Sequence, residues 1–174
     1  AIFQQFVGIN AVFYYSNLIW ASVGFNETEA FTTSTIISVV NVVFTVVAIL
    51  LIDRVGRKPL LLVGSLGMAA TLGTLAVVFA TAPKIVAGAG VAESTVGNPI
   101  LSHDLGIVAV LALNLFVAFF AATWGPIVWV LLGEMFPNSI RAAALSITVM
   151  ANWIANFVVS ETFPELTKAS LGVA

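Results

Sequence analysis

Long apolar stretches separated by short polar links dominate this chain. They run at about residues 2–22, 32–52, 59–82, 105–133 and 141–163. Each is close to or above the roughly 20 residues that an α-helix needs to cross the hydrocarbon core of a bilayer. The pattern therefore predicts five transmembrane helices and an all-α integral membrane protein.

Polar residues recur at helical spacing inside two of these stretches. The polar positions of the second stretch are Ser34, Ser38, Asn41 and Thr45. Those of the fifth are Thr148, Asn152, Asn156 and Ser160, with Trp153 beside them. Spacings of three and four place each set on one narrow helix face, which indicates a cavity or another helix opposite. For the hydroxyl side chains, hydrogen bonding between helices is the alternative to a ligand.

The first stretch sets carboxamides and phenols in an otherwise apolar run. Its polar members are Gln4, Gln5, Asn10, Tyr14, Tyr15 and Asn17. Gln and Asn supply donors and acceptors without charge, which suits the hydroxyl groups of a neutral ligand. In hydrocarbon such groups are costly unless they find partners or face a wet cavity. The stretch therefore predicts a binding site for an uncharged polar ligand.

A single straight helix would divide these side chains between two faces. Gln4, Gly8 and Tyr15 share one face, whereas Asn10 and Tyr14 lie on another. We expect a break near Gly8 that lets both sets approach one ligand, as in the interrupted helices of transporters. The alternative for the two tyrosines is an interfacial aromatic belt.

The third stretch and the link after it predict packing and a loop. Ala69-x-x-x-Gly73 is a small-residue pair that permits close helix approach. The link at about 83–104 is rich in Pro and Gly and predicts an irregular external loop. It contains His103, the only histidine, and a lone loop histidine without nearby Cys or His does not indicate a metal site.

The fourth stretch contains Trp124-Gly125-Pro126-Ile127-Val128-Trp129. Pro126 removes an intrahelical hydrogen bond and clashes with the preceding turn, so a bend is expected there. Trp124 and Trp129 are suited to stack on a sugar ring while their indole N–H groups donate to hydroxyls. The alternative is that both tryptophans pack inside the bundle.

The links between the apolar stretches carry nearly all the charge. Hydrophobic residues make up 60% of the chain and charged residues 8%, against about half and a quarter in globular proteins. The absence of cysteine excludes disulfides and thiolate metal sites. A net charge of −2 without a basic patch argues against nucleic-acid binding. The chain opens inside an apolar stretch without Met, so we expect a fragment.

Two of the links carry basic and acidic residues together. Their charged members are Asp53, Arg54, Arg57, Lys58, Glu134 and Arg141. Under the positive-inside rule the links near 53–58 and 134–141 are cytoplasmic. Exposed ion pairs are worth only about 0 to 1 kcal/mol each, which suits a latch that must open. A solvated loop is the alternative, but it does not explain Asp53 and Glu134.

Four ordered motifs resemble the sugar porter family of the major facilitator superfamily. They are Gln-Gln-x-x-Gly-Ile-Asn-x-x-x-Tyr-Tyr at 4–15, Asp-Arg-x-Gly-Arg-Lys at 53–58, Trp-Gly-Pro-x-x-Trp at 124–129 followed by Glu-Met-Phe-Pro-Asn-Ser-Ile-Arg at 134–141, and Asn-Trp-x-x-Asn-Phe at 152–157. The likeness is strongest to bacterial xylose/proton symporters. It implies helices seven to eleven of a twelve-helix bundle, so residues 1–174 would be a partial C-terminal six-helix domain.

The resemblance also implies roles for residues. The sugar-binding set would be Gln4, Gln5, Asn10, Asn41, Trp124, Trp129, Asn152 and Asn156. Tyr14 and Tyr15 would belong to the external gate. The cytoplasmic charge network that holds the outward-facing state would comprise Asp53, Arg54, Arg57, Lys58, Glu134 and Arg141. The implied partners are a monosaccharide, protons, the lipid bilayer of the plasma membrane and the missing N-terminal half of the transporter.

Departures from the family pattern leave alternatives open. Animal glucose transporters carry Glu at the position of Ala121, and xylose symporters carry Gln at that of Asn152. The choice between a pentose and a hexose as the substrate therefore stays open. The proton-coupling carboxylate of the family lies outside this chain, which keeps a facilitated-diffusion uniporter as an alternative. A sugar sensor or a structural bundle is a further one. No nucleophile–base pair or metal-ligand cluster indicates an enzyme, and we expect no cofactor or metal.

Overall fold

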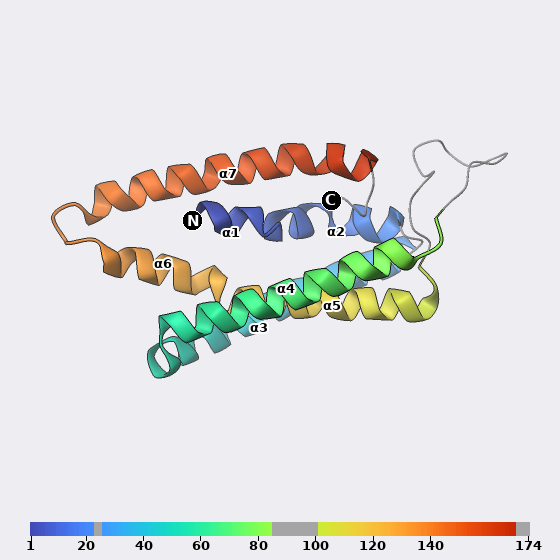
Figure 1. Ribbon diagram of the computed structural model, residues 1–174, viewed down its shortest axis with the longest axis horizontal. Coiled ribbons are helices and arrows are strands. Elements are labelled where there is room, and N and C mark those ends of the chain that lie inside the picture. Colours follow the sequence, from blue (N-terminus) through green and yellow to red (C-terminus); the bar gives the residue numbers. More distant parts are fainter. Residues whose placement is uncertain (23–25, 85–100, 170–174) are drawn as a thin grey trace.

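The computed structural model describes residues 1–22, 26–84 and 101–169, and every secondary-structure element in these ranges is a helix. Figure 1 shows α1 (Ile2–Phe6), α2 (Ile9–Ser22), α3 (Glu27–Val55), α4 (Arg57–Thr81), α5 (His103–Ala122), α6 (Trp124–Met135) and α7 (Arg141–Ala169). Most of the predicted loop at 83–104 lies outside the described residues.

Four helical segments are long and apolar enough to cross a membrane. They are Glu27–Val55, Arg57–Thr81, His103–Met135 and Arg141–Glu165, and they correspond to the second to fifth predicted stretches. The first stretch instead forms two helices of 5 and 14 residues. The prediction of an all-α membrane protein is therefore confirmed.

Helix α3 begins earlier than the apolar pattern predicts because Asn26 caps it. The backbone N–H of Glu29 donates to Asn26 Oδ1 at 2.8 Å, and the N–H of Asn26 donates to Glu29 Oε2 at 3.0 Å. This reciprocal capping box satisfies backbone donors that would otherwise be unpaired at a helix start. Polar residues therefore add a turn to the helix before its apolar part.

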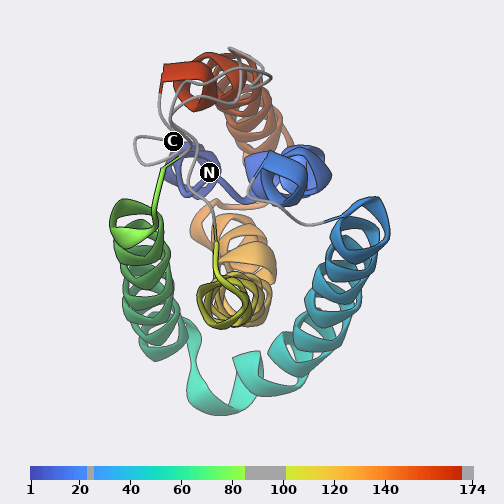
Figure 2. The same ribbon diagram turned by 90° about the vertical axis from the view of Figure 1, so that its right-hand side faces the viewer.

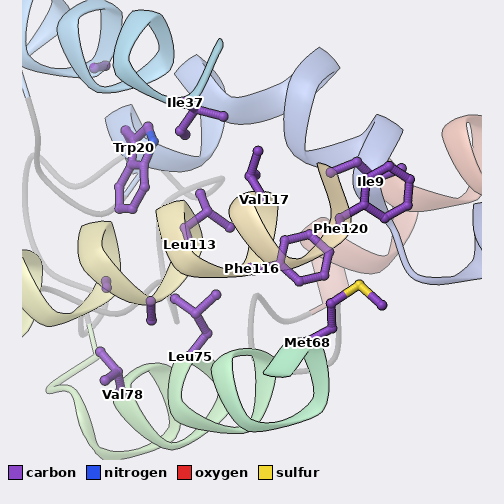
Figure 3. Packing of buried hydrophobic residues seen from close by; sticks show 13 residues of the cluster. Ile9, Trp20, Ile37, Met68, Leu75, Val78, Leu113, Phe116, Val117 and Phe120 are labelled. Carbon is purple, nitrogen blue, oxygen red and sulfur yellow. The ribbon is translucent and has the colours of Figure 1, made fainter. Parts of the chain in front are cut away.

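Helix α5 is the centre of the bundle. In the end-on view of Figure 2, α5 and α6 lie between α3 and α4, with α1 and α2 above them and α7 beyond. Phe116 and Val117 of α5 are completely buried, and α3 contributes Ile37 and α4 contributes Met68 to the same cluster (Figure 3). By contrast, large apolar side chains such as Leu66 on α4 are exposed, as expected for a surface that faces lipid.

Helix α4 approaches α5 through two glycines. A Cβ on Gly64 would lie 1.9 Å from Thr123 Oγ1, and a Cβ on Gly67 would lie 2.5 Å from the Phe119 ring. Ala69 and Gly73, the pair that the sequence predicts to permit close helix approach, are both exposed, so no described helix packs closely against them. The small residues that face α5 are those one to two turns earlier.

The predicted break near Gly8 is confirmed. Val7 ends α1, and Gly8 has φ +83°, a backbone conformation that L side chains rarely adopt. The N–H of Gly8 donates to the Gln5 carbonyl, and the Gly8 carbonyl accepts from Val12. The two helices therefore join through one glycine that changes the chain direction.

A second break separates α5 from α6 at Thr123, which has φ −137° and ψ −82°. The sequence predicted a bend at Pro126. The observed break lies three residues earlier, at Thr123. A proline ring clashes with the carbonyl four residues earlier, here Ala122, and Ala122 is the last residue of α5. Pro126 itself lies in the first turn of α6, where no intrahelical donor is required.

Candidate functional site

Four carboxamides from three helices form one hydrogen-bonded cluster, called here the amide cluster: Gln5 of α1, Asn10 of α2, and Asn152 and Asn156 of α7. Gln5 Nε2 donates to Asn152 Oδ1 at 2.9 Å. Asn10 Nδ2 donates to Asn156 Oδ1 at 2.9 Å and to Gln5 Oε1 at 2.5 Å. Gln5, Asn152 and Asn156 are buried, and Asn10 is half-buried.

The break at Gly8 makes this cluster possible. Five residues along an unbroken helix would turn Gln5 and Asn10 about 140° away from each other. The left-handed glycine redirects α2, so both side chains meet the same face of α7. Asn152 and Asn156 share that face because they lie one helical turn apart. The cluster is uncharged, and its donors and acceptors are of the kind that hydroxyl groups can replace.

Gln4 points toward α6 and not into the amide cluster. Its Nε2 donates to the carbonyls of Trp124 at 2.8 Å and Gly125 at 3.3 Å. Its Oε1 is buried and has no hydrogen-bond partner in the described part of the chain. Gln4 therefore links the two broken helical segments, and one of its polar atoms is left unpaired.

The two tryptophans of the fourth stretch differ in their surroundings. Trp124 is half-buried against the core cluster, and its Nε1 donates to Ser65 Oγ at 2.9 Å and to the Leu61 carbonyl at 3.3 Å. The N–H that we expected to donate to a sugar is thus bound to α4 in this conformation. Trp129 lies further along α6 and is 37% exposed.

Asn41 and Tyr14 form no hydrogen bond with the amide cluster in the described part of the chain. Asn41 is half-buried on α3, and its side chain makes no hydrogen bond within residues 1–22, 26–84 and 101–169. Ser38 and Thr45 of the same stripe each donate to the carbonyl four residues earlier in α3. Tyr14 is 57% exposed. The side chain of Tyr15 lies outside the described residues.

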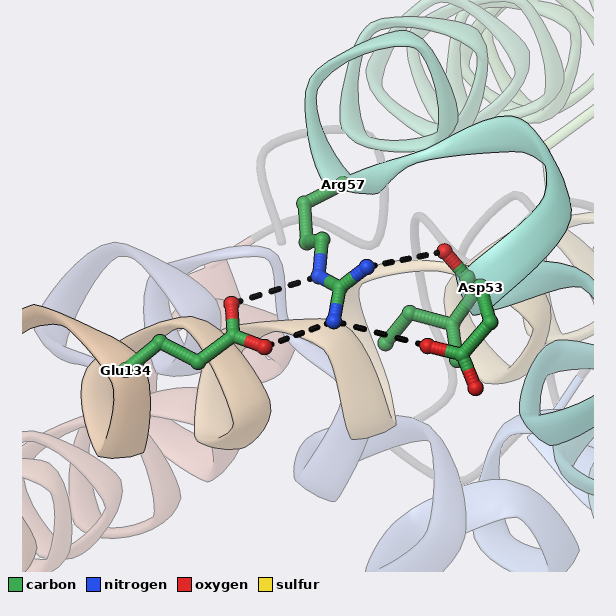
Figure 4. A network of polar contacts seen from close by, with 4 residues as sticks. Asp53, Arg57 and Glu134 are labelled. Carbon is green, nitrogen blue, oxygen red and sulfur yellow. Dashed lines mark hydrogen bonds and ion pairs between the residues drawn. The ribbon is translucent and has the colours of Figure 1, made fainter.

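Arg57 is the centre of a charged cluster formed by the links 53–58 and 134–141 (Figure 4). Its Nη2 lies 2.6 Å from Glu134 Oε1, and its Nε donates to Glu134 Oε2 at 3.2 Å. This two-point contact joins the start of α4 to the end of α6. Asp53 is 3.5 Å from the same Nη2, and Nη1 donates to the Ile52 carbonyl.

The other basic residues of the predicted network are placed differently. Arg141 Nε donates to the Phe136 carbonyl at 3.2 Å and so closes the link between α6 and α7. Arg54 and Lys58 are exposed, and neither forms an ion pair with a described residue. The links 53–58 and 134–141 lie at the same end of the bundle in Figure 1.

A cavity of about 520 Å³ opens elsewhere, between the starts of α3 and α5. Thr28, Thr33 and His103 are among its lining residues, and none of the amide cluster is. Within the described ranges, no group of three or more His, Cys, Asp or Glu residues could hold a metal ion. The neutral amide cluster is therefore the strongest candidate site in the described part of the chain.

Sequence analysis missed Ser65 and Asn114. Ser65 accepts from Trp124, but it reads as one small residue among many in a packing helix. Asn114 lies in the middle of α5, where its Nδ2 donates to the Val110 carbonyl and its buried Oδ1 has no hydrogen-bond partner among the described residues. Asn114 could have been found as a lone Asn in an apolar stretch. Nothing in the sequence distinguishes Ser65.

Comparisons with known proteins agree on one family. Residues 1–173 match the family model described as "Sugar (and other) transporter". A glucose transport protein of Synechocystis is 53% identical over 94% of this chain and 33% of its own length. The D-xylose-proton symporter of Escherichia coli is 44% identical over 100% of this chain and 31% of its own. A glucose facilitated diffusion protein of Zymomonas mobilis is 40% identical over 94% and 30%.

Solved structures give the same result. A double tryptophan mutant of the xylose transporter XylE matches with a TM-score of 0.81 and 43% identity, covering 100% of this chain and 32% of that one. XylE from E. coli in an inward open conformation matches with a TM-score of 0.70 and 43% identity, covering 94% and 30%. The chain thus spans about a third of the length of its curated relatives.

Proposed function

Since this chain belongs to the sugar (and other) transporter family of the major facilitator superfamily, we propose that the whole protein carries a monosaccharide across the plasma membrane. The sugar is xylose or a hexose such as glucose or galactose. Transport proceeds by alternating access and is coupled to protons as symport. The family is a class of transporters and not of enzymes.

The observation that carries this proposal is the amide cluster. Gln5, Asn10, Asn152 and Asn156 collect neutral donors and acceptors at a helix break in an apolar bundle. Burying such groups is costly unless they are hydrogen-bonded, and here the four side chains hydrogen-bond to one another. A sugar that enters exchanges amide–amide bonds for amide–hydroxyl bonds. This exchange is nearly balanced in energy, so the sugar can be released on the other side.

The complete sugar site of this proposal includes four further residues: Gln4, Asn41, Trp124 and Trp129. With its N–H bound to Ser65, Trp124 offers the sugar the face of its ring. Gln4 Oε1 is a buried acceptor without a partner in the described ranges, and a sugar hydroxyl would satisfy it. Tyr14 and Tyr15 act as the external gate.

The charged cluster serves as a cytoplasmic latch in this scheme. Arg57 and Glu134 tie α4 to α6, and Arg54, Lys58 and Arg141 supply the positive charge that places these links in the cytoplasm. The Glu134 side chain is 47% exposed, so the pair is worth only about 0 to 1 kcal/mol and opens readily. The latch holds the outward-facing state.

Facilitated diffusion is the second candidate function. It is favoured by the 40% identity to a protein named for glucose facilitated diffusion. The amide cluster itself contains no carboxylate that could take up a proton. Symport is preferred because the xylose relative, named as a proton symporter, matches the chain over its full length.

The deciding experiment is uptake of labelled xylose, glucose and galactose by vesicles that contain the full-length protein, with and without an inward proton gradient. Accumulation of one sugar against its gradient, driven by protons, is expected. Equilibration without accumulation would establish the uniporter instead. Absence of uptake of every sugar would overturn transport and favour a sensor or a structural bundle. Gln5→Ala provides the control that links uptake to the amide cluster.

A further inference from the structure

We propose that Ser65 is a positioning residue for the sugar site, although it lies on α4 and outside the amide cluster. It fixes Trp124 at the start of α6, and through Trp124 it fixes the break between α5 and α6. The inference rests on the transport function proposed above. It adds an outer helix to the elements that determine sugar affinity.

The hydrogen bonds around Ser65 are directional. Its hydroxyl donates to the Leu61 carbonyl at 2.8 Å, so its single proton is already used. The oxygen lone pairs then remain as acceptors, and Trp124 Nε1 donates to them at 2.9 Å. An indole N–H can only donate, so a serine bonded to its own helix is a matched partner. Replacing it leaves a half-buried N–H with only the 3.3 Å contact to Leu61.

Helix α4 is shaped to bring Ser65 to this place. The neighbouring Gly64 touches Thr123, the residue at which the helix breaks, and has no room for a Cβ there. Thr123 Oγ1 donates to the Phe119 carbonyl at 2.6 Å and so completes the last turn of α5. The break at Thr123 therefore packs directly against Gly64 of α4. The next residue of α4, Ser65, carries the hydroxyl that binds Trp124.

The first turn of α6 is held from the opposite side as well. Gln4 of α1 donates to the carbonyls of Trp124 and Gly125. Trp124 is therefore held at its backbone by α1 and at its indole ring by α4. Loss of the Ser65 acceptor frees the ring, displaces the carbonyls that Gln4 binds and changes the site without touching the sugar.

The test is a double-mutant cycle in the full-length transporter: Ser65→Ala, Trp124→Phe and both together. Ser65→Ala is expected to raise the KM for sugar uptake about 2- to 10-fold, the effect of losing one hydrogen bond. In the Trp124→Phe background, which lacks the donor, Ser65→Ala is expected to have no further effect. Thr74→Ala is the matched control, because this exposed hydroxyl of α4 donates to the Ala70 carbonyl and to no other described residue.

Amide hydrogen exchange supplies a readout that does not depend on transport. Ser65→Ala is expected to speed exchange at residues 123–129 while Thr74→Ala leaves it unchanged. Unchanged KM and unchanged exchange in Ser65→Ala, or additive effects in the cycle, would overturn the positioning role. If the wild type takes up no sugar, the transport proposal fails. Unchanged amide exchange in Ser65→Ala separately refutes the positioning of Trp124 by Ser65.

Discussion

Replacing Gly8 by alanine probes the break between α1 and α2 without removing any side chain. Gly8 has φ +83°, where an L residue is disfavoured by roughly 1–2 kcal/mol. A Cβ placed there has nothing within 4 Å, so no steric contact adds to that energy. The expected loss of about 1–2 kcal/mol in the free energy of unfolding therefore arises from the backbone conformation and not from a clash of the added methyl group.

Gly73→Ala is the matched control. Gly73 also has open space around its missing Cβ, but it lies inside α4 and has no positive φ. Alanine in a helix interior is more stable than glycine by about 0.5–1 kcal/mol. The same chemical change is thus expected to destabilise at one position and stabilise at the other, a difference of about 1.5–3 kcal/mol.

The assay is equilibrium unfolding of the full-length protein in mixed micelles titrated with a denaturing detergent, together with sugar binding by calorimetry. Gly8→Ala is also expected to weaken sugar binding, because straightening the chain separates Asn10 from Gln5. Equal unfolding free energies for the two variants would refute the left-handed break. A destabilised Gly8→Ala that binds sugar normally would separate the break from the site.

Three other substitutions address the latch, the amide cluster and the turn between α3 and α4. Glu134→Gln is expected to change the unfolding free energy by less than about 1 kcal/mol while lengthening the spin-label distance between the ends of α4 and α6; an unaltered distance distribution would contradict the latch to Arg57. Gln5→Ala is expected to weaken sugar affinity about 2- to 10-fold, with Ser146→Ala on the exposed face of α7 as the calorimetric control; equal affinities would remove Gln5 from the site. Gly56→Ala is expected to lower thermal stability, because φ +89° and ψ 160° are open almost only to glycine and an L residue there is strained by about 1–3 kcal/mol; an unchanged melting temperature would disprove this.

Local signals in the sequence were enough to predict the membrane helices, the break at Gly8 and a bend within three residues of Thr123. Apolar length identified the stretches, since crossing hydrocarbon imposes the same requirement on every helix. Gly8 was identifiable because polar residues on both sides of it need a common partner. The spacing of Asn152 and Asn156 predicted a polar face, and that face does hold the carboxamides that bind Gln5 and Asn10.

What the sequence did not predict depends on how neighbouring helices are rotated. The choice of Gly64 and Gly67 over Ala69 and Gly73 follows from the face that α4 turns toward α5. The bond from Trp124 to Ser65 joins residues 59 positions apart. The break at Thr123 lies three residues before Pro126, because the proline ring clashes with the carbonyl four residues earlier and is tolerated in the first turn of α6.

The hydroxyls of α3 bear on how the chain enters the bilayer during synthesis. Five of them donate to the carbonyl four residues earlier: Thr32, Ser34, Thr35, Ser38 and Thr45. All five hydrogen bonds lie within α3, so a newly made α3 can leave the translocation channel without a partner helix. Gln5 and Asn10, by contrast, find Asn152 and Asn156 only once α7 has been made. The hydrogen bonds that join α1 and α2 to α7 thus connect residues 147 and 146 positions apart and can form only late in synthesis.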